Sequence, residues 1–174
     1  MRFIALIVCL ALAAPVTCLQ AVAQERTDVE LVLLADASGS IDDAEIVFQR
    51  QGYADAITDP QILSVIRSGA YGKIALTYVE WGSTESQAVV VPWTVIGDEA
   101  SGAAFAKRLM AEPRRAFGRN AIGNAIAFAQ ALIETNDVEG FRKVIDLSAD
   151  SANSWGGIPI TEDSFMRSAR TLAS

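Results

Sequence analysis

Short apolar runs and helical periodicities alternate along this chain. Residues 31–35 form a continuous apolar run that ends at Asp36, which predicts that the strand over 28–35 is buried on both faces, as in a parallel sheet. Residues 143–150 make a second such strand, again ending in an aspartate. Residues 73–81 and 86–93 are rich in β-branched and aromatic side chains. The turn-like residues between them indicate a β-hairpin.

Helical periods and capping signals fill the gaps between these strands. Asp42 and Glu45 have the spacing of a capping box, and Pro60 is typical of the first position of a short second helix. A third helix is expected after Asp98. The clearest helical pattern covers 122–133, with Asn120 where its N-cap is expected. Residues 161–172 predict a last helix.

This element order predicts an α/β fold of the Rossmann-like kind. We expect a mostly parallel sheet with helices on both faces, strand order 3-2-1-4 and an antiparallel edge strand. Pro92 favours the edge position for the second hairpin strand, because proline lacks the N–H that a central strand needs. Asp36 and Asp150 would then end neighbouring strands, close to Asn120, at the edge of the sheet where ligands bind.

The first 23 residues have the features of a secretory signal peptide. One positive charge at Arg2 precedes an apolar stretch over 3–14, and Ala-Val-Ala at 21–23 matches a cleavage site. We therefore expect an exported protein, periplasmic or secreted, with one domain over 24–174 and no membrane insertion after cleavage.

Three tryptophans follow: Trp81 and Trp93 are expected in the core, and Trp155 beside the candidate site.

Composition excludes several classes of function. The 174-residue chain has no histidine, and both cysteines, Cys9 and Cys18, lie in the predicted signal peptide. This excludes Ser-His-Asp and Cys-His catalysis, zinc sites of Cys and His, and a disulfide scaffold. Loss of Arg2 leaves 13 basic and 21 acidic side chains, a net charge of −8. The basic residues are scattered, so nucleic acid and anionic membranes are not expected partners.

Asp36, Ser38 and Ser40 place one carboxylate and two hydroxyls within five residues. These are hard oxygen donors suited to Mg²⁺, Mn²⁺ or Ca²⁺. Asp, Ser and Gly also dominate ordinary turns, so the pentapeptide alone leaves a turn and a metal site both open. Convergence with Asp150 and Asn120 favours the metal site.

Asp-x-Ser-x-Ser after an apolar strand resembles the metal-ion-dependent adhesion site (MIDAS) of von Willebrand factor A-type (VWA) domains. The resemblance extends to Asp150 and to Gly118-Arg119-Asn120-Ala121-Ile122-Gly123, in which Asn120 takes the place of a threonine. More narrowly, the segments 49–53, 91–96 and 144–148 resemble an uncharacterised group of exported bacterial VWA-like proteins.

This resemblance implies a binding module and not an enzyme. It implies one Mg²⁺ or Mn²⁺ held directly by Ser38 and Ser40, with Asp36 and Asp150 acting mostly through bound waters. An open coordination position would accept an acidic group from a partner protein. Asn120 could offer its amide oxygen or act only as an N-cap, and both interpretations stay open.

Two further functions remain as alternatives. The first is a degenerate VWA-like domain that binds no metal. This interpretation is favoured by Ser151, because related sequences have glycine at that position. A Mg²⁺-dependent phosphatase of the aspartyl-phosphate type would need a second acid two residues after Asp36, where Ser38 stands.

VWA-like sheets usually have six strands, so the resemblance also predicts a C-terminally incomplete domain. The strand at 144–147 would then be an exposed edge that could pair with a second copy of the chain.

Overall fold

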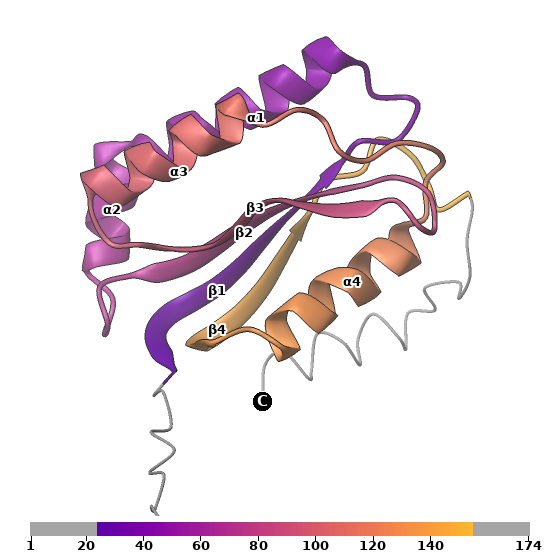
Figure 1. Cartoon of the computed structure of the whole chain (residues 1–174). Coiled ribbons are helices and arrows are strands. Elements are labelled where there is room, and N and C mark those ends of the chain that lie inside the picture. Colours follow the sequence, from indigo (N-terminus) through magenta and orange to yellow (C-terminus); the bar gives the residue numbers. More distant parts are fainter. Residues whose placement is uncertain (1–23, 155–174) are drawn as a thin grey trace, which may run out of the picture.

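The computed structural model describes residues 24–154, which form a four-stranded sheet between two layers of helices (Figure 1). The strands are β1 (Glu25–Asp36), β2 (Ile74–Trp81), β3 (Gln87–Ile96) and β4 (Val138–Leu147), in the order β3-β2-β1-β4. β1 is parallel to β2 and β4, and β2 is antiparallel to β3. This topology confirms the predicted fold class and its VWA-like strand order.

The helices are divided unequally between the two faces of the sheet. α1 (Asp43–Thr58), α2 (Pro60–Arg67) and α3 (Glu99–Ala111) lie on one side, and α4 (Ile122–Glu134) lies on the other (Figure 1). Each face buries its own apolar core, and a fully buried aliphatic side chain contributes about 1.5–3 kcal/mol. Trp81 and Trp93 both belong to the core under α4, as expected.

Local signals set the starts of three helices as predicted. The Asp42 side chain accepts a hydrogen bond from the Glu45 N–H, while the Glu45 side chain accepts one from Asp42 N–H, which completes the capping box of α1. Pro60 is the first residue of α2. Asp98 caps α3 by accepting from the Ser101 N–H.

The strand boundaries differ from the sequence expectation at three places. β1 begins three residues early, at Glu25, because Glu25 to Thr27 pair with the start of β4. β3 continues through Pro92 to Ile96, since β3 is an edge strand and Pro92 is exposed there. β4 covers Val138–Leu147, so Asp150 lies in the loop after the strand and not at its end.

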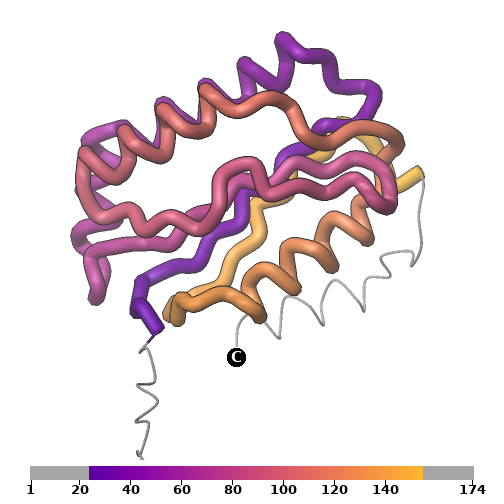
Figure 2. The backbone as a smooth tube through the Cα atoms, in the orientation of Figure 1, coloured from indigo at the N-terminus to yellow at the C-terminus, as the bar shows by residue number. Residues whose placement is uncertain are grey.

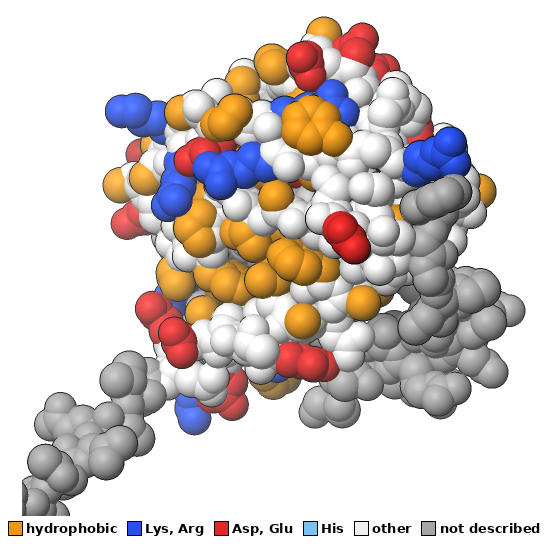
Figure 3. Space-filling model, turned by 45° about the vertical axis from the view of Figure 1, so that its right-hand side comes forward, with side chains coloured by type: hydrophobic (Ala, Val, Ile, Leu, Met, Phe, Trp, Pro, Cys, Tyr) orange, Lys and Arg blue, Asp and Glu red, His pale blue; other side chains and the backbone are white. Residues whose placement is uncertain are grey.

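Among the described strands β4 pairs with β1 alone, so the segment 144–147 lies at a sheet edge, as predicted. On the face in Figure 3 basic side chains are scattered among acidic and apolar ones. Within residues 24–154 no helix combines the length and apolar character needed to cross a membrane. The expected signal peptide, Trp155 and the last expected helix lie outside the described residues.

A buried ion pair joins the sheet to the helices above it. Arg50 of α1 and Glu80 of β2 approach to 2.6 Å, with side chains 5% and 0% exposed. Arg50 also donates to the backbone carbonyls of Leu109, Glu112 and Pro113. This pair therefore fixes the segment that leaves α3 and passes beside the candidate site.

Candidate metal site

The candidate site lies at the carboxyl ends of β1 and β4. Three loops meet there: residues 37–42 after β1, the segment before α4, and the segment after β4 (Figure 2). Backbone hydrogen bonds join them, from Gly39 N–H to the Gly118 carbonyl at 2.6 Å and from Ser154 N–H to the Asn120 carbonyl at 3.0 Å. The parallel pairing of β1 with β4 brings these distant segments together.

Asp36 is the buried carboxylate of the site, with 2% of its surface exposed. Its Oδ1 accepts the Ser38 N–H at 2.8 Å and its Oδ2 accepts the Asp150 N–H at 3.3 Å. Over residues 24–154 no lysine or arginine forms an ion pair with it. A buried carboxylate without a cation is costly, and a bound divalent ion is one way to offset that cost.

Two hydroxyls lie side by side in the loop after β1. The Oγ atoms of Ser38 and Ser40 are 3.1 Å apart, and Ser38 is completely buried. Adjacent ligands of an octahedral Mg²⁺ with bonds of 2.0–2.1 Å lie roughly 2.9 Å apart. The two hydroxyls therefore have the separation that neighbouring ligands of such an ion require.

Asp150 closes the site from the loop after β4, and its residue is exposed. Hydrogen bonding lowers the pKa of its carboxyl below the ordinary value, with the Ser40 hydroxyl as the largest cause. The Ser151 and Asn120 side chains add to this lowering of the pKa, and desolvation opposes it. Asp150 is thus held in the charged form that a cation would need.

Asn120 belongs to the site but does not cap α4. The N-cap is Ala121, which makes no side-chain cap bond, and Asn153 Oδ1 accepts the Ile122 N–H at 2.9 Å instead. Asn120 is 6% exposed, and its amide nitrogen donates to the Ser151 hydroxyl. The N-cap interpretation of Asn120 was therefore wrong, because its side chain turns toward the loop after β4. A half-turn of the amide would present its oxygen instead.

The structure brings together all five residues predicted from the sequence: Asp36, Ser38, Ser40, Asn120 and Asp150. Hydrogen bonds join Asp36 to Ser38 and Asp150, and Ser40 to Ser38 and Asp150. Their donor set of carboxylate, hydroxyl and amide oxygens suits a small hard cation. In the described part of the chain no three His, Cys, Asp or Glu side chains are placed so that they could hold a metal ion together, so such a site would depend on the serines.

Two supporting residues were missed at the sequence level. Ser148 Oγ accepts the Asp36 N–H at 3.0 Å and the Gln49 side chain at 2.8 Å, which anchors the end of β1. Arg114 donates to the carbonyls of Ala37 and Ser38 at 2.8 and 3.0 Å. Ser148 could have been found from the sequence, because it lies only two residues before Asp150. Arg114 gave none beyond its charge.

Gly118 lets the loop before α4 approach the turn between β2 and β3. Its φ of +105° lies in a region that other residues rarely adopt, and an added Cβ would come within 2.8 Å of Ser83. A substitution here would push the loop before α4 away from the turn between β2 and β3, which the hydrogen bond from Ser83 N–H to the Phe117 carbonyl joins.

Comparison with known proteins yields one family and several solved structures. Residues 26–171 match the model of the family described as "Protein of unknown function (DUF1194)". A search of the curated proteins finds no significant match. The chain is similar to the vWF domain of the type V pili tip protein Mfa5 from Porphyromonas gingivalis, with 14% identity and a TM-score of 0.45 over 75% of this chain and 39% of that one. It is also similar to the pilus adhesin SpaC from Lactobacillus rhamnosus GG in its open conformation, with 17% identity and a TM-score of 0.47 over 70% of this chain and 15% of that one.

Proposed function

The chain belongs to the DUF1194 family, and we propose that it is an exported binding module that recognises a partner protein through a divalent cation. The cation is Mg²⁺ or Mn²⁺, with Ca²⁺ as a weaker candidate, because all the available donors are hard oxygens. The partner supplies an acidic group to the ion.

One observation carries this proposal: a buried carboxylate without a cationic partner among the described residues adjoins two hydroxyls at ligand spacing. Asp36 is 2% exposed, and the Oγ atoms of Ser38 and Ser40 are 3.1 Å apart. A cation at this position would compensate the buried charge and use both hydroxyls. The chain has no histidine, so a serine nucleophile activated by a histidine base is excluded.

Each residue has a distinct role in the proposed site. Ser38 and Ser40 hold the ion directly, and Asp36 and Asp150 orient the waters around it, as the VWA resemblance implies. Asn120 stands at the threonine position and reaches the site with its amide. The ion would supply the positive charge that an acidic group of the partner needs.

Calorimetric titration of residues 24–174 with Mg²⁺ and Mn²⁺, together with melting curves, tests the proposal. A ligand that binds only the folded state stabilises it by about 2.7 kcal/mol at a hundred times its Kd. We expect a higher Tm in millimolar Mn²⁺ or Mg²⁺ and loss of that rise in Ser40→Ala. Ser64→Ala, an exposed serine of α2, is the matched control and should keep the rise.

Asp36→Ala should also abolish the rise in Tm. Because Asp36 accepts two backbone N–H groups, this variant is informative only where its metal-free fold is intact. A wild-type protein whose Tm ignores both ions would refute the metal-dependent function.

A second candidate is a VWA-like domain that binds its partner without metal. One observation favours it: Asn120 and Ser151 already hydrogen-bond to each other beside Asp150, so these loops are joined without an ion. If neither ion gives a heat of binding in calorimetry or changes the Tm, this second function would be favoured. Steady release of phosphate from p-nitrophenyl phosphate in Mg²⁺ would instead select the hydrolase alternative.

A further inference from the structure

We infer that Arg114 is the positioning residue that orients the Ser38 hydroxyl for the cation. This inference rests on the proposed function, because it assigns a residue to the same site. Arg114 lies in the segment after α3, outside every part of the predicted motif, and its side chain is 14% exposed.

The argument starts from the two peptide units on either side of Ser38. In a trans peptide the N–H and C=O groups point in opposite directions, so bonding both groups fixes the peptide plane. The Ala37–Ser38 peptide is bonded at both ends, because its carbonyl accepts from Arg114 at 2.8 Å and its N–H donates to Asp36 at 2.8 Å.

The Ser38–Gly39 peptide is held in the same way. The Ser38 carbonyl accepts from Arg114 at 3.0 Å, and the Gly39 N–H donates to the Gly118 carbonyl at 2.6 Å. With both planes fixed, the backbone dihedral angles of Ser38 are set. The direction of its Cα–Cβ bond follows from them. The Arg114 guanidinium thus binds the carbonyl of each of the two peptides that flank Ser38. These two peptide planes set the direction in which the Ser38 side chain leaves the backbone.

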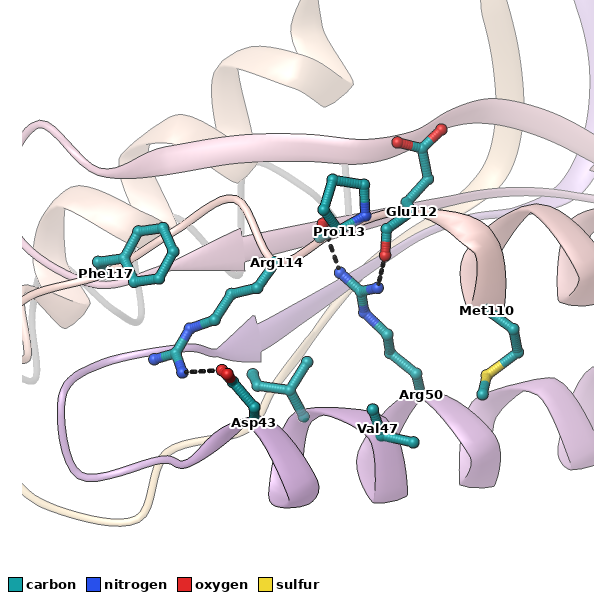
Figure 4. Close-up of a pocket in the computed structure, with 9 residues that line it drawn as sticks. Asp43, Val47, Arg50, Met110, Glu112, Pro113, Arg114 and Phe117 are labelled. Carbon is teal, nitrogen blue, oxygen red and sulfur yellow. Dashed lines mark hydrogen bonds and ion pairs between the residues drawn. The ribbon is translucent and has the colours of Figure 1, made fainter.

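The guanidinium is itself held by several contacts. Its Nε donates to the Ala116 carbonyl at 3.1 Å, one terminal nitrogen pairs with Asp43 at 3.0 Å, and the group lies 4.8 Å from the centre of the Phe117 ring (Figure 4). Arg114, Asp43 and Phe117 line a cavity of about 300 Å³ between α1 and the segment after α3. The carbonyl contacts on one side and these contacts on the other leave little freedom for the side chain.

Lysine cannot reproduce this arrangement. One terminal nitrogen of the guanidinium donates to both carbonyls, while its other nitrogens donate to Ala116 and Asp43. A lysine ammonium ends one bond short of that terminal nitrogen and lacks the rigid fork needed to make all four contacts at once. Arg114→Lys therefore keeps the charge and the possibility of pairing with Asp43 while removing the bridge between the two peptides. The ion pair itself contributes little, because the Asp43 side chain is 90% exposed.

The experiment compares three variants of residues 24–174: Arg114→Lys, Asp43→Asn and the control Arg115→Lys. Arg115 is the next residue, and its side chain pairs with Glu112 instead of the site loop. Mn²⁺ affinity is measured by calorimetry. Amide exchange of Ser38 and Gly39 is measured by NMR without metal, and melting curves check the overall fold.

We expect Arg114→Lys to weaken Mn²⁺ binding roughly 10–100-fold, the usual cost of losing a residue that orients a metal ligand. Amide exchange should accelerate at Ser38 and Gly39 while exchange in the strands stays unchanged. Asp43→Asn and Arg115→Lys should keep the affinity of the wild type. A purely structural role for Arg114 would instead lower Tm and leave the affinity of the folded variant unchanged.

Two results would overturn the inference. One is Mn²⁺ affinity in Arg114→Lys equal to that of the wild type, and the other is unchanged exchange at Ser38 and Gly39. If the wild type binds no metal, the proposed function fails while the exchange measurement still decides whether Arg114 orders the loop. Equal losses of affinity in Asp43→Asn would assign the effect to the ion pair and also contradict the inference.

Discussion

Replacing Glu80 with glutamine should destabilise the protein far more than a surface substitution of the same kind. The Glu80 carboxylate accepts from two nitrogens of Arg50, at 2.6 and 3.2 Å, and from the Arg115 N–H at 2.7 Å. The side chains of Arg50 and Glu80 are 5% and 0% exposed. Glutamine has nearly the same shape but leaves the Arg50 charge buried without a counter-charge.

The magnitude follows from the burial of both partners. Removing one member of a buried ion pair costs about 3–5 kcal/mol, because the remaining charge is no longer compensated. For a domain of this size 1 kcal/mol corresponds to about 2–4 °C, so Tm should fall by roughly 6–20 °C. The segment holding Arg114 should loosen too, since Arg50 donates to the carbonyls of Glu112 and Pro113.

Urea and thermal unfolding of residues 24–174, followed by circular dichroism, measure this change. Glu139→Gln is the control, because Glu139 pairs with Arg26 at 3.6 Å with both side chains at least 60% exposed. Such surface pairs contribute about 0–1 kcal/mol. The double variant Arg50→Met, Glu80→Leu removes both charges and should recover much of the lost stability. Equal Tm values for Glu80→Gln and Glu139→Gln would refute the reasoning.

Three further predictions concern individual side chains. Asn153→Ala should lower the free energy of unfolding by about 0.5–2 kcal/mol in urea melts, because it removes the cap of α4; an unchanged value would contradict that role. Asn120→Thr should tighten Mn²⁺ binding in calorimetry while costing about 1 kcal/mol of metal-free stability through the lost hydrogen bond to Ser151; unchanged affinity would remove Asn120 from the ligand set. Burial raises the pKa of Tyr53 to about 12 from 10.0, so the folded state retains this proton longer than the unfolded state. The resulting stabilisation is fully present below pH 10 and is lost as the pH rises through about 12. The free energy of unfolding, measured by urea melts, should therefore fall less from neutral to strongly alkaline pH in Tyr53→Phe than in the wild type. Equal falls in the two proteins would contradict the raised pKa of Tyr53.

Local patterns in the sequence were sufficient to predict the architecture of the fold. Apolar runs and helical periods act over a few residues, and so do the caps formed by Asp42 and Asp98 and the helix start at Pro60. Pro92 indicated the sheet edge, because a missing N–H has the same consequence in any fold. Strand order then followed from the limited set of α/β topologies, and it was enough to bring Asp36 and Asp150 together.

Contacts between distant loops were decided only by the tertiary structure. The cap of α4 comes from Asn153, which lies 31 residues from Ile122, and the Arg114 bond to Ser38 spans 76 residues. Neither contact leaves a local pattern, since each depends on how two irregular loops approach at the end of the sheet. The sequence by itself therefore determined which five candidate ligands converge on the site, but not that Ser148 and Arg114 support them. The packing of the loops decided which of them cap, hold or orient the others, because hydrogen-bond geometry depends on the final positions of both partners.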